Sequence, residues 1–150
     1  IENFSGTVFL HLLITTCLTL GEEMEMYKDP YVYFGRLSQE MLRACRLVVD
    51  TGMHALKWTR QRAINYMANY TADDRHDIES EIDRYISIPG QALAYKIGEI
   101  KLRSLRSMAE SALGKRFDVK KFHDFLMVMG NIPLAQLEKQ VKRFIAEQLS

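Results

Sequence analysis

The sequence predicts an all-α fold of six or seven helices joined by short loops, in an irregular orthogonal or bundle array without a sheet. Apolar residues recur at the 3.6-residue spacing of a helix in several segments, and no segment alternates apolar and polar residues as a strand would. Proline, glycine and capping residues separate these segments. No interdomain linker or repeat interrupts the 150 residues, so we expect a single helical domain.

The first helix of this pattern covers residues 31–52, after the turn signal Asp29-Pro30. We expect Gly52 to end it in a left-handed cap, which glycine adopts without strain. The apolar face expected to be buried consists of Leu37, Met41, Ala44, Cys45 and Val48.

Two shorter helices follow, one from the N-cap Thr59 to about residue 70 and one from Asp73 or Asp74 to the Pro89-Gly90 break. Proline ends the second because it lacks a donor and restricts the residue before it. Their inward faces are Ala63, Tyr66 and Met67, and then Ile78, Ile82, Tyr85 and Ile86.

The C-terminal part predicts three more helices: residues 91–113, the longest, ended by Gly114; residues 118–130; and a last one with Pro133 in its first turn. In the first of these, Leu93, Ile97, Ile100, Met108 and Ala112 face inward beside Leu105. The other two stripes are Phe122, Phe125, Leu126 and Met129, and Leu134, Leu137, Val141, Phe144 and Ile145.

Composition excludes several classes of protein. Twenty basic and nineteen acidic residues give a net charge of +1, which argues against a nucleic-acid partner. Ten basic and five acidic residues lie in 101–150, and we interpret these basic residues as solvated helix faces rather than as a phosphate-binding surface. Two cysteines are too few for a disulfide scaffold.

The chain begins with an apolar run, residues 7–20, and carries one charged residue, Glu2, in its first twenty. Fourteen residues fall short of the roughly 20 that a membrane-spanning helix needs. No basic residues precede the run, as a signal peptide would require. We therefore favour a buried helix or strand, with a membrane or export segment as the alternative.

Familiar catalytic and metal-binding motifs are absent. There is no His-Glu-x-x-His, Cys-x-x-Cys, Gly-x-Ser-x-Gly or phosphate loop. The histidines at 11, 54, 76 and 123 do not share the spacing that places two ligands on one helix face. We expect no metal site contained within this chain.

Two segments nonetheless combine polar and aromatic residues. Arg43, Arg46 and Asp50 share one helical face, and a partly buried arginine needs a carboxylate, so Asp50 is the expected partner in a structural ion pair. His54 follows at the helix end, as either a cap or part of a polar site. In the second segment, Tyr85 and Tyr95 flank the Pro-Gly break, which is either a simple helix corner or a place where a tyrosine donates to an oxyanion.

These segments belong to a longer pattern. The pieces that carry it are DPY at 29–31, GRL at 35–37, RACRLVVDTGMH at 43–54, WT at 58–59, EIDRY at 81–85, PGQALAYKIGE at 89–99, LG at 113–114, FD at 117–118, FH at 122–123 and PL at 133–134. From about Gly21 to Ile145, the chain resembles the C-terminal part of the bacterial domain-of-unknown-function 885 family.

The resemblance implies a helical zinc metallopeptidase. Full-length members are several times longer and carry His-Glu-x-x-Pro-Gly-His upstream, for two zinc ligands and a general base, and Glu-Gly-Trp-Ala-x-Tyr-x-Glu for the third ligand. A zinc-bound water attacking a peptide carbonyl is the implied chemistry. Neither motif occurs here, and residues 11–18 occupy the place of the second. The apolar run thus has a third interpretation, as a region that is diverged, truncated or in another frame.

The resemblance also suggests roles for matched residues. His54, Tyr85 and Tyr95 are the catalytic candidates, as stabilisers of a tetrahedral intermediate, and Arg84 and Gln91 are the substrate-binding candidates. Arg43, Arg46 and Asp50 are expected to form the scaffold beneath. Zinc is implied for the full-length family and no cofactor for this chain, which we expect to be catalytically silent alone.

The alternative function is a non-enzymatic helical module for protein–protein interaction or dimerisation. Its partners would be a second copy or another protein, bound through exposed apolar surface; a peptide substrate belongs to the complete enzyme. Neither hypothesis includes a nucleic acid or a membrane span. The bacterial compartment, exported, periplasmic or cytoplasmic, stays open.

Overall fold

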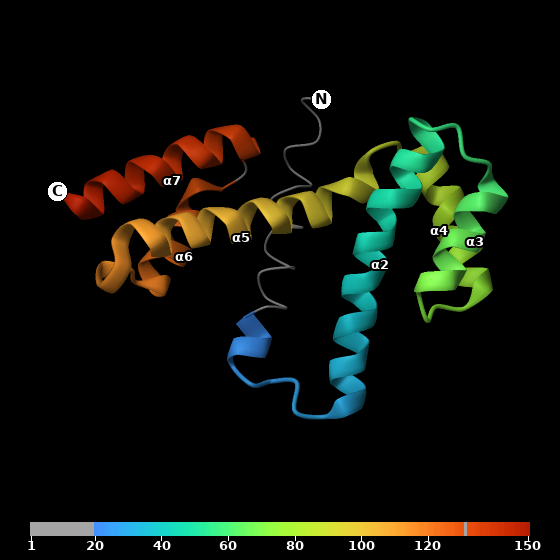
Figure 1. Ribbon diagram of the computed structural model, residues 1–150, viewed down its shortest axis with the longest axis horizontal. Coiled ribbons are helices and arrows are strands. Elements are labelled where there is room, and N and C mark those ends of the chain that lie inside the picture. The colour runs from blue at the N-terminus through green and yellow to red at the C-terminus, as the bar shows by residue number, and fades with distance from the viewer. Residues whose placement is uncertain (1–19, 131) are drawn as a thin grey trace. The chain divides into compact units, whose positions relative to one another are not determined.

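The computed structural model describes residues 20–130 and 132–150, and this part of the chain is helical without strands (Figure 1). A short helical stretch, residues 20–23, comes first. The helices are α2 (Pro30–His54), α3 (Arg60–Tyr70), α4 (Arg75–Ser87), the 3-10 helix η2 (Gln91–Leu93), α5 (Ala94–Leu113), the 3-10 helix η3 (Gly114–Arg116), α6 (Val119–Met129) and α7 (Leu134–Leu149). The predicted all-α fold is confirmed. The expectation for residues 7–20 lies outside the described residues, except for Leu20.

The described residues divide into two compact units, one ending at Lys96 and the other beginning at Ile97. The first contains α2, α3, α4 and η2, and the second contains almost all of α5 together with α6 and α7. Each has its own hydrophobic core. The single-domain assignment stays a prediction. No helix of the described part is both long and apolar enough to cross a membrane.

In the first unit, α2 packs against α3 and α4 through its C-terminal half. Thr59 and Asp74 begin α3 and α4 as predicted, and Asp29, expected only as part of a turn, caps α2; each accepts a hydrogen bond from a backbone N–H of the following turn. An exposed two-point ion pair, Arg60 with Asp83, joins α3 to α4. The buried core consists of Cys45, Val49, Ala63, Ile64, Met67, Ile78, Ile82, Tyr85 and Ala92.

The second unit packs α5, α6 and α7 around aromatic residues. Asp118 caps α6, and the left-handed backbone of Gly114 (φ +52°) ends α5, both as the sequence predicts. Phe122 is 1% exposed, and its ring lies 6.1 Å from that of Phe144 in an edge-to-face contact. The buried residues of this core are Leu102, Leu105, Ala109, Leu113, Phe122, Leu137, Val141, Phe144 and Ile145.

The prediction for Gly52 is wrong. The α2 helix continues to His54, so Gly52 is helical and buried rather than a left-handed cap. A Cβ at this position would lie 2.6 Å from the ring of Trp58. Glycine is needed here because the indole approaches the helix backbone closely, not because the chain turns.

Three predictions about helix faces and lengths are also wrong. The longest described helix is α2, with 25 residues, and residues 91–93 form the separate 3-10 turn η2. Three of the five residues expected on the buried face of α2 are exposed: Leu37, Met41 and Val48. Four residues expected to face inward on later helices are exposed as well: Ile86, Ile97, Ile100 and Ala112. Periodicity identifies the apolar face of a helix, but only a packing partner buries it.

Candidate functional site

The first unit brings most of the predicted site residues together in one polar group. We call Arg46, Glu81, Arg84, Tyr85, Gln91 and Tyr95 the arginine–tyrosine cluster. Arg46 comes from α2, the next three from α4, Gln91 from η2 and Tyr95 from the first turn of α5. The turn at Pro89-Gly90 lets the chain reverse, so that residues on both sides of it meet the same face of α2.

Arg46 is the buried centre of the cluster, with 6% of its surface exposed. Its guanidinium carbon lies 4.5 Å from the ring centroid of Tyr95 and 4.9 Å from that of Tyr85. The Nη2 atom donates to Oε1 of Gln91 at 3.0 Å, and Nε has no partner among the described residues. Two aromatic faces and one amide therefore accommodate this charge.

Glu81 joins the arginine and tyrosine of α4. Arg84 donates to both of its carboxylate oxygens, at 3.1 and 2.6 Å, and the Tyr85 hydroxyl donates to Oε2 at 2.5 Å. Burial alone would raise the pKa of Glu81, but the hydrogen bonds from Arg84 and Tyr85 and the charges of Arg84 and Arg46 outweigh it and lower the pKa. Glu81 is therefore ionised at neutral pH.

Tyr85 is 1% exposed, and its hydroxyl is already used by Glu81. Burial and the hydrogen bond to Glu81 raise its pKa well above the ordinary value. Its single donor is thus not available to an oxyanion, and these contacts favour a structural role for Tyr85 over the catalytic one we considered.

Asp50 supports the turn beside the cluster. Both carboxylate oxygens lie 3.1 Å from the backbone nitrogen of Gly90, which has a left-handed φ of +82°. Asp50 is 2% exposed, and in the described part of the chain it forms no ion pair with Arg46, the pairing we expected. The buried carboxylate instead connects α2 to the start of η2.

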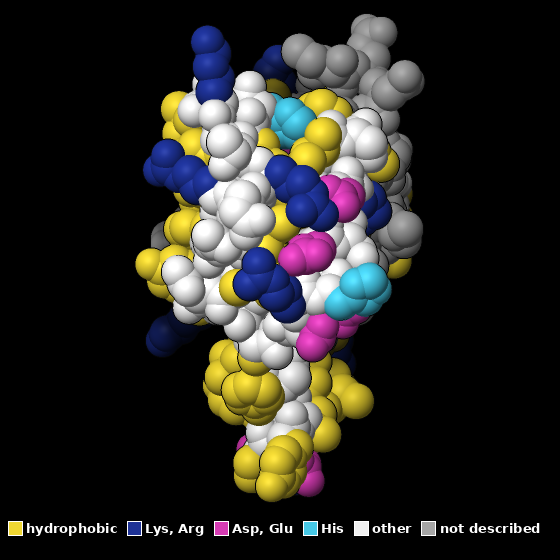
Figure 2. All heavy atoms as spheres, turned by 90° about the vertical axis from the view of Figure 1, so that its right-hand side faces the viewer, with side chains coloured by type: hydrophobic (Ala, Val, Ile, Leu, Met, Phe, Trp, Pro, Cys, Tyr) yellow, Lys and Arg dark blue, Asp and Glu magenta, His cyan; other side chains and the backbone are white. Residues whose placement is uncertain are grey.

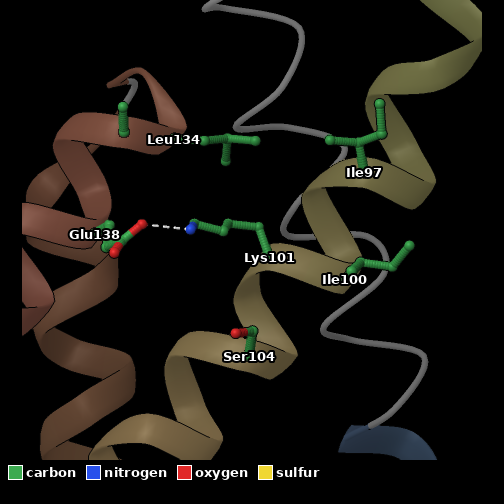
Figure 3. A pocket seen from close by; sticks show the side chains of 7 residues that line it. Ile97, Ile100, Lys101, Ser104, Leu134 and Glu138 are labelled. Carbon is green, nitrogen blue, oxygen red and sulfur yellow. Dashed lines mark hydrogen bonds and ion pairs between the residues drawn. The ribbon is translucent and has the colours of Figure 1, made fainter.

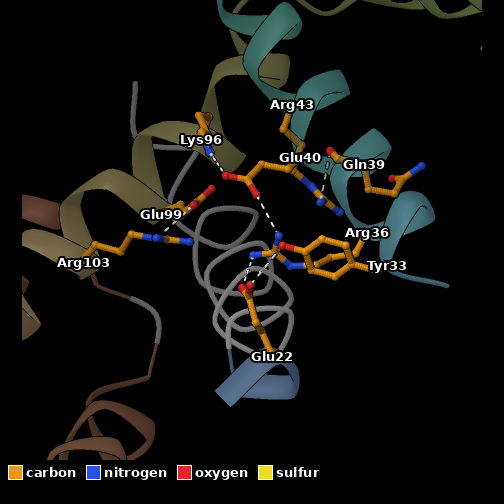
Figure 4. Close-up of polar contacts among 9 residues, drawn as sticks. All are labelled: Glu22, Tyr33, Arg36, Gln39, Glu40, Arg43, Lys96, Glu99 and Arg103. Atoms are coloured by element: carbon orange, nitrogen blue, oxygen red, sulfur yellow. Dashed lines mark hydrogen bonds and ion pairs between the residues drawn. The ribbon is translucent and has the colours of Figure 1, made fainter. Parts of the chain in front are cut away.

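The two remaining predicted residues lie at the edge of this region. His54 is exposed, and its Nε2 lies 3.0 Å from the backbone oxygen of Tyr85, so that it joins the end of α2 to α4. Arg43 donates to the backbone oxygen of Gln39 at 3.3 Å (Figure 4). Its guanidinium carbon lies 5.9 Å from the centroid of the Tyr95 ring.

Sequence reasoning missed a second polar group in the first unit. Arg36 pairs with Glu22 at 2.5 Å and with Glu40 at 3.4 Å, and Lys96 donates to Glu40 at 3.2 Å (Figure 4).

Sequence reasoning also missed Glu81 of the arginine–tyrosine cluster, although Glu81 lies in a matched segment. Its i,i+3 and i,i+4 spacing to Arg84 and Tyr85 is the signal that could have found it.

The second unit contains a separate groove of about 470 Å³ between α5 and α7 (Figure 3). Apolar side chains line it, and the Nζ of Lys101 contacts Glu138 across it at 2.5 Å. The hydrogen bonds from Lys101 and then Lys142 lower the pKa of Glu138 to about 2. A catalytic acid would have a pKa nearer to the pH at which it works. The lowered pKa of Glu138 therefore favours a structural role for its pair with Lys101.

The described residues do not suit the zinc ion that the family resemblance implies. No three His, Cys, Asp or Glu side chains in residues 20–130 and 132–150 come together as a group that could hold a metal ion. A catalytic zinc needs three protein ligands and an open position. The described residues therefore do not supply the ligands of such a zinc site.

Comparison with known proteins shows which family the chain belongs to. The family model described as "Bacterial protein of unknown function (DUF885)" matches residues 18–141. The chain belongs to this family. The sequence-based resemblance over about 21–145 is thereby confirmed at the level of the family.

One solved structure shows the same fold within a longer protein. The crystal structure of the "putative lipoprotein" from Colwellia psychrerythraea matches with a TM-score of 0.90 and 40% identity, over 94% of the present chain. The match covers 24% of the Colwellia chain, so the present chain spans about a quarter of that relative. A comparison with curated proteins finds no match.

Proposed function

We propose that this chain is a non-catalytic helical portion of a larger DUF885 hydrolase, in which it forms part of the peptide-binding wall. The arginine–tyrosine cluster carries the proposal. Its buried members, Arg46 and Tyr85, bond to Gln91 and Glu81. Three further members, Arg84, Gln91 and Tyr95, are only partly buried, and they form the open part of the cluster. The match to a quarter of a longer relative supports the view that catalytic groups come from elsewhere in a family protein.

The contacts suggest how the edge would act. Glu81 neutralises Arg84 through a two-point ion pair, so Arg84 offers little net charge to a substrate carboxylate. The Oε1 atom of Gln91 accepts from Arg46 and Arg84, which leaves its amide N–H groups as the donors for a ligand. The edge therefore favours the backbone carbonyls of an extended peptide over a free carboxylate.

In this proposal, Arg46, Glu81, Tyr85 and Asp50 are positioning residues. They orient Gln91 and Tyr95 by connecting α2, α4 and the η2 turn, and they do not touch substrate. His54 extends the same support to the end of α2. The roles we considered for His54, Tyr85 and Tyr95 in stabilising a tetrahedral intermediate stay hypotheses about the complete enzyme.

Zinc calorimetry and a broad peptide-cleavage screen test catalytic silence. We expect no stoichiometric, tight zinc binding by this chain and no turnover, with or without added zinc. Tight stoichiometric binding together with cleavage would show that the chain is an enzyme in its own right.

A peptide-binding assay tests whether the arginine–tyrosine cluster contributes to a peptide-binding surface. Fluorescent extended peptides titrated onto the chain should bind, and Gln91→Ala should weaken binding by about 2- to 10-fold, the value of one hydrogen bond of about 0.5–1.5 kcal/mol. Gln61→Ala is the matched control, because Gln61 is an exposed residue of the same unit that pairs with Asn65 on α3. Equal effects of the two substitutions, or no peptide binding, would argue against the wall.

A second candidate function, the non-enzymatic interaction or dimerisation module, is favoured by a different observation. Large apolar side chains are exposed along α2, including Tyr31 at 87% and Phe34 at 59%. A soluble domain rarely leaves such a contiguous surface without a partner.

A further inference from the structure

Exposed apolar side chains occur in both units of the molecule. Figure 2 shows hydrophobic side chains of the first unit gathered at the bottom of the view, where Figure 1 places the start of α2. In the second unit, Ile97 and Ile100 are 44% and 55% exposed, and both line the groove between α5 and α7. We call this cavity of about 470 Å³ the α5–α7 groove, and its lining residues are Ile97, Ile100, Lys101, Ser104, Leu134, Ala135 and Glu138.

The charged groups at the α5–α7 groove do not balance one another. Glu138 supplies one carboxylate, whose Oε2 accepts from Lys101 at 2.5 Å and whose Oε1 accepts from Lys142 at 2.7 Å. Two ammonium groups therefore share one carboxylate, which leaves an excess of one positive charge beside an apolar cavity. An anionic group on a ligand would balance this excess, so charge complementarity selects an anion.

Lys101 lies where it can meet such an anion. In Figure 3 its side chain reaches across the groove from α5 toward α7, with Leu134 and Ile97 on one side of it and Ser104 on the other. An ammonium group has three N–H donors, and in the described part of the chain Glu138 accepts from one of them. The remaining donors, together with the hydroxyl of the exposed Ser104, can serve a second carboxylate.

The rest of the lining selects the body of the ligand. It is aliphatic and consists of Ile97, Ile100, Leu134 and Ala135. Polar groups along the ligand would be left unpaired against these side chains, and a peptide carries an amide at every residue. The groove therefore favours a saturated chain with one charged end over a peptide. Its volume lies in the lower half of the roughly 300–1,000 Å³ of small-molecule sites, which suits a chain of medium length.

We propose that the α5–α7 groove binds a medium-chain aliphatic carboxylate. The carboxylate accepts hydrogen bonds from Lys101 and Ser104, and the chain lies along Ile97, Ile100 and Leu134. This site goes beyond the proposed peptide-binding wall and does not rest on it, because the groove belongs to the second unit and the arginine–tyrosine cluster to the first.

Isothermal titration calorimetry with sodium octanoate tests the proposal on the unmodified chain, and we expect one octanoate per chain. Octanol should bind about tenfold or more weakly, because it lacks the charge that Lys101 would meet, and octylammonium should bind more weakly still. Affinity should rise from hexanoate to octanoate by up to about 4-fold per methylene, because each methylene removes apolar surface from water.

Two substitutions separate the contribution of the carboxylate from that of the chain. Lys101→Met keeps an unbranched side chain and removes the charge, so octanoate binding should weaken by about tenfold or more while octanol binding stays the same. Ile100→Ser should weaken the binding of both ligands, because it removes apolar contact. Lys139→Met is the matched control, because Lys139 is an exposed lysine of α7 that does not line the groove. Circular dichroism checks that each variant keeps its helices.

Three results would overturn the proposal: no octanoate binding by the folded chain, equal losses with Lys101→Met and Lys139→Met, or octanol binding as tight as that of octanoate. A tripeptide with aliphatic side chains and a free C-terminus that binds more tightly than octanoate would also reject the saturated chain. Gln91→Ala should leave octanoate binding unchanged, so this proposal and the peptide-binding wall can fail separately.

Discussion

The two glycines of α2 should respond to alanine with opposite signs. At Gly35 a Cβ would meet nothing within 4 Å, so Gly35→Ala should stabilise the helix by about 0.5–1 kcal/mol through the higher helix propensity of alanine. At Gly52 a Cβ would lie 2.6 Å from Cδ2 and Cε3 of Trp58, well inside the ordinary contact range of 3.4–4 Å. The indole would have to retreat by roughly an ångström.

That retreat has a cost because Trp58 is held from other directions. The Arg62 guanidinium lies 4.2 Å from its ring and the Tyr66 ring 5.7 Å away. Forcing a methyl into such a contact costs about 1–3 kcal/mol, which exceeds the propensity gain. We therefore expect Gly52→Ala to lower the free energy of unfolding, with a difference from Gly35→Ala of about 1–3 kcal/mol.

Urea unfolding followed by tryptophan fluorescence measures both effects, because Trp58 is the only tryptophan of the chain. The folded-state emission of Gly52→Ala should shift as the indole becomes more exposed, and that of Gly35→Ala should not. The double variant Gly52→Ala with Trp58→Ala, whose unfolding is followed by circular dichroism because it has no tryptophan, should lose less stability than the two single effects added together. Gly52→Ala that is as stable as Gly35→Ala, with unchanged emission, would refute the close-approach explanation.

Three further substitutions test the cores and polar contacts. Glu138→Gln should make the free energy of unfolding depend less on pH between 4.5 and 2. Because the pKa of Glu138 is lowered, its pair with Lys101 stabilises the fold above pH 4.5 and is lost as the pH falls toward 2. Urea midpoints measured across this range test the difference. Asp50→Ala should destabilise by about 1–3 kcal/mol, because it removes both acceptors of the Gly90 amide, and chemical denaturation measures this loss. Phe122→Ala should cost about 3–5 kcal/mol in a thermal or urea melt, because it empties the centre of the second core.

The helices were predictable because their signals are local. Asp29, Thr59, Asp74 and Asp118 define helix starts through hydrogen bonds that reach only two or three residues along the chain. Gly114 ends α5 for an equally local reason, its positive φ. Gly52 gave the same signal and was misjudged, because its neighbour Trp58 approaches the helix from beyond its end.

The sequence predicted which residues belong to the candidate site better than it predicted which groups each of them contacts. Arg46, Arg84, Tyr85, Gln91 and Tyr95 do come together. Their partners depend on how α2 crosses α4 and η2, and helical spacing does not contain that information. The nearest carboxylate in sequence to Arg46 therefore proved to bind a backbone amide, whereas aromatic rings surround the arginine.

The sequence by itself determined the all-α class, most helix boundaries and the family, because caps, breaks and matched motifs are written in consecutive residues. Tertiary structure alone decided which apolar faces are buried, and it left Leu37, Met41 and Val48 of α2 exposed. It likewise decided that Asp50 supports a turn and that Glu81 engages the Tyr85 hydroxyl. Burial and polar pairing depend on two surfaces in contact. The sequence of one helix determines the residues on its own faces but not which element packs against them.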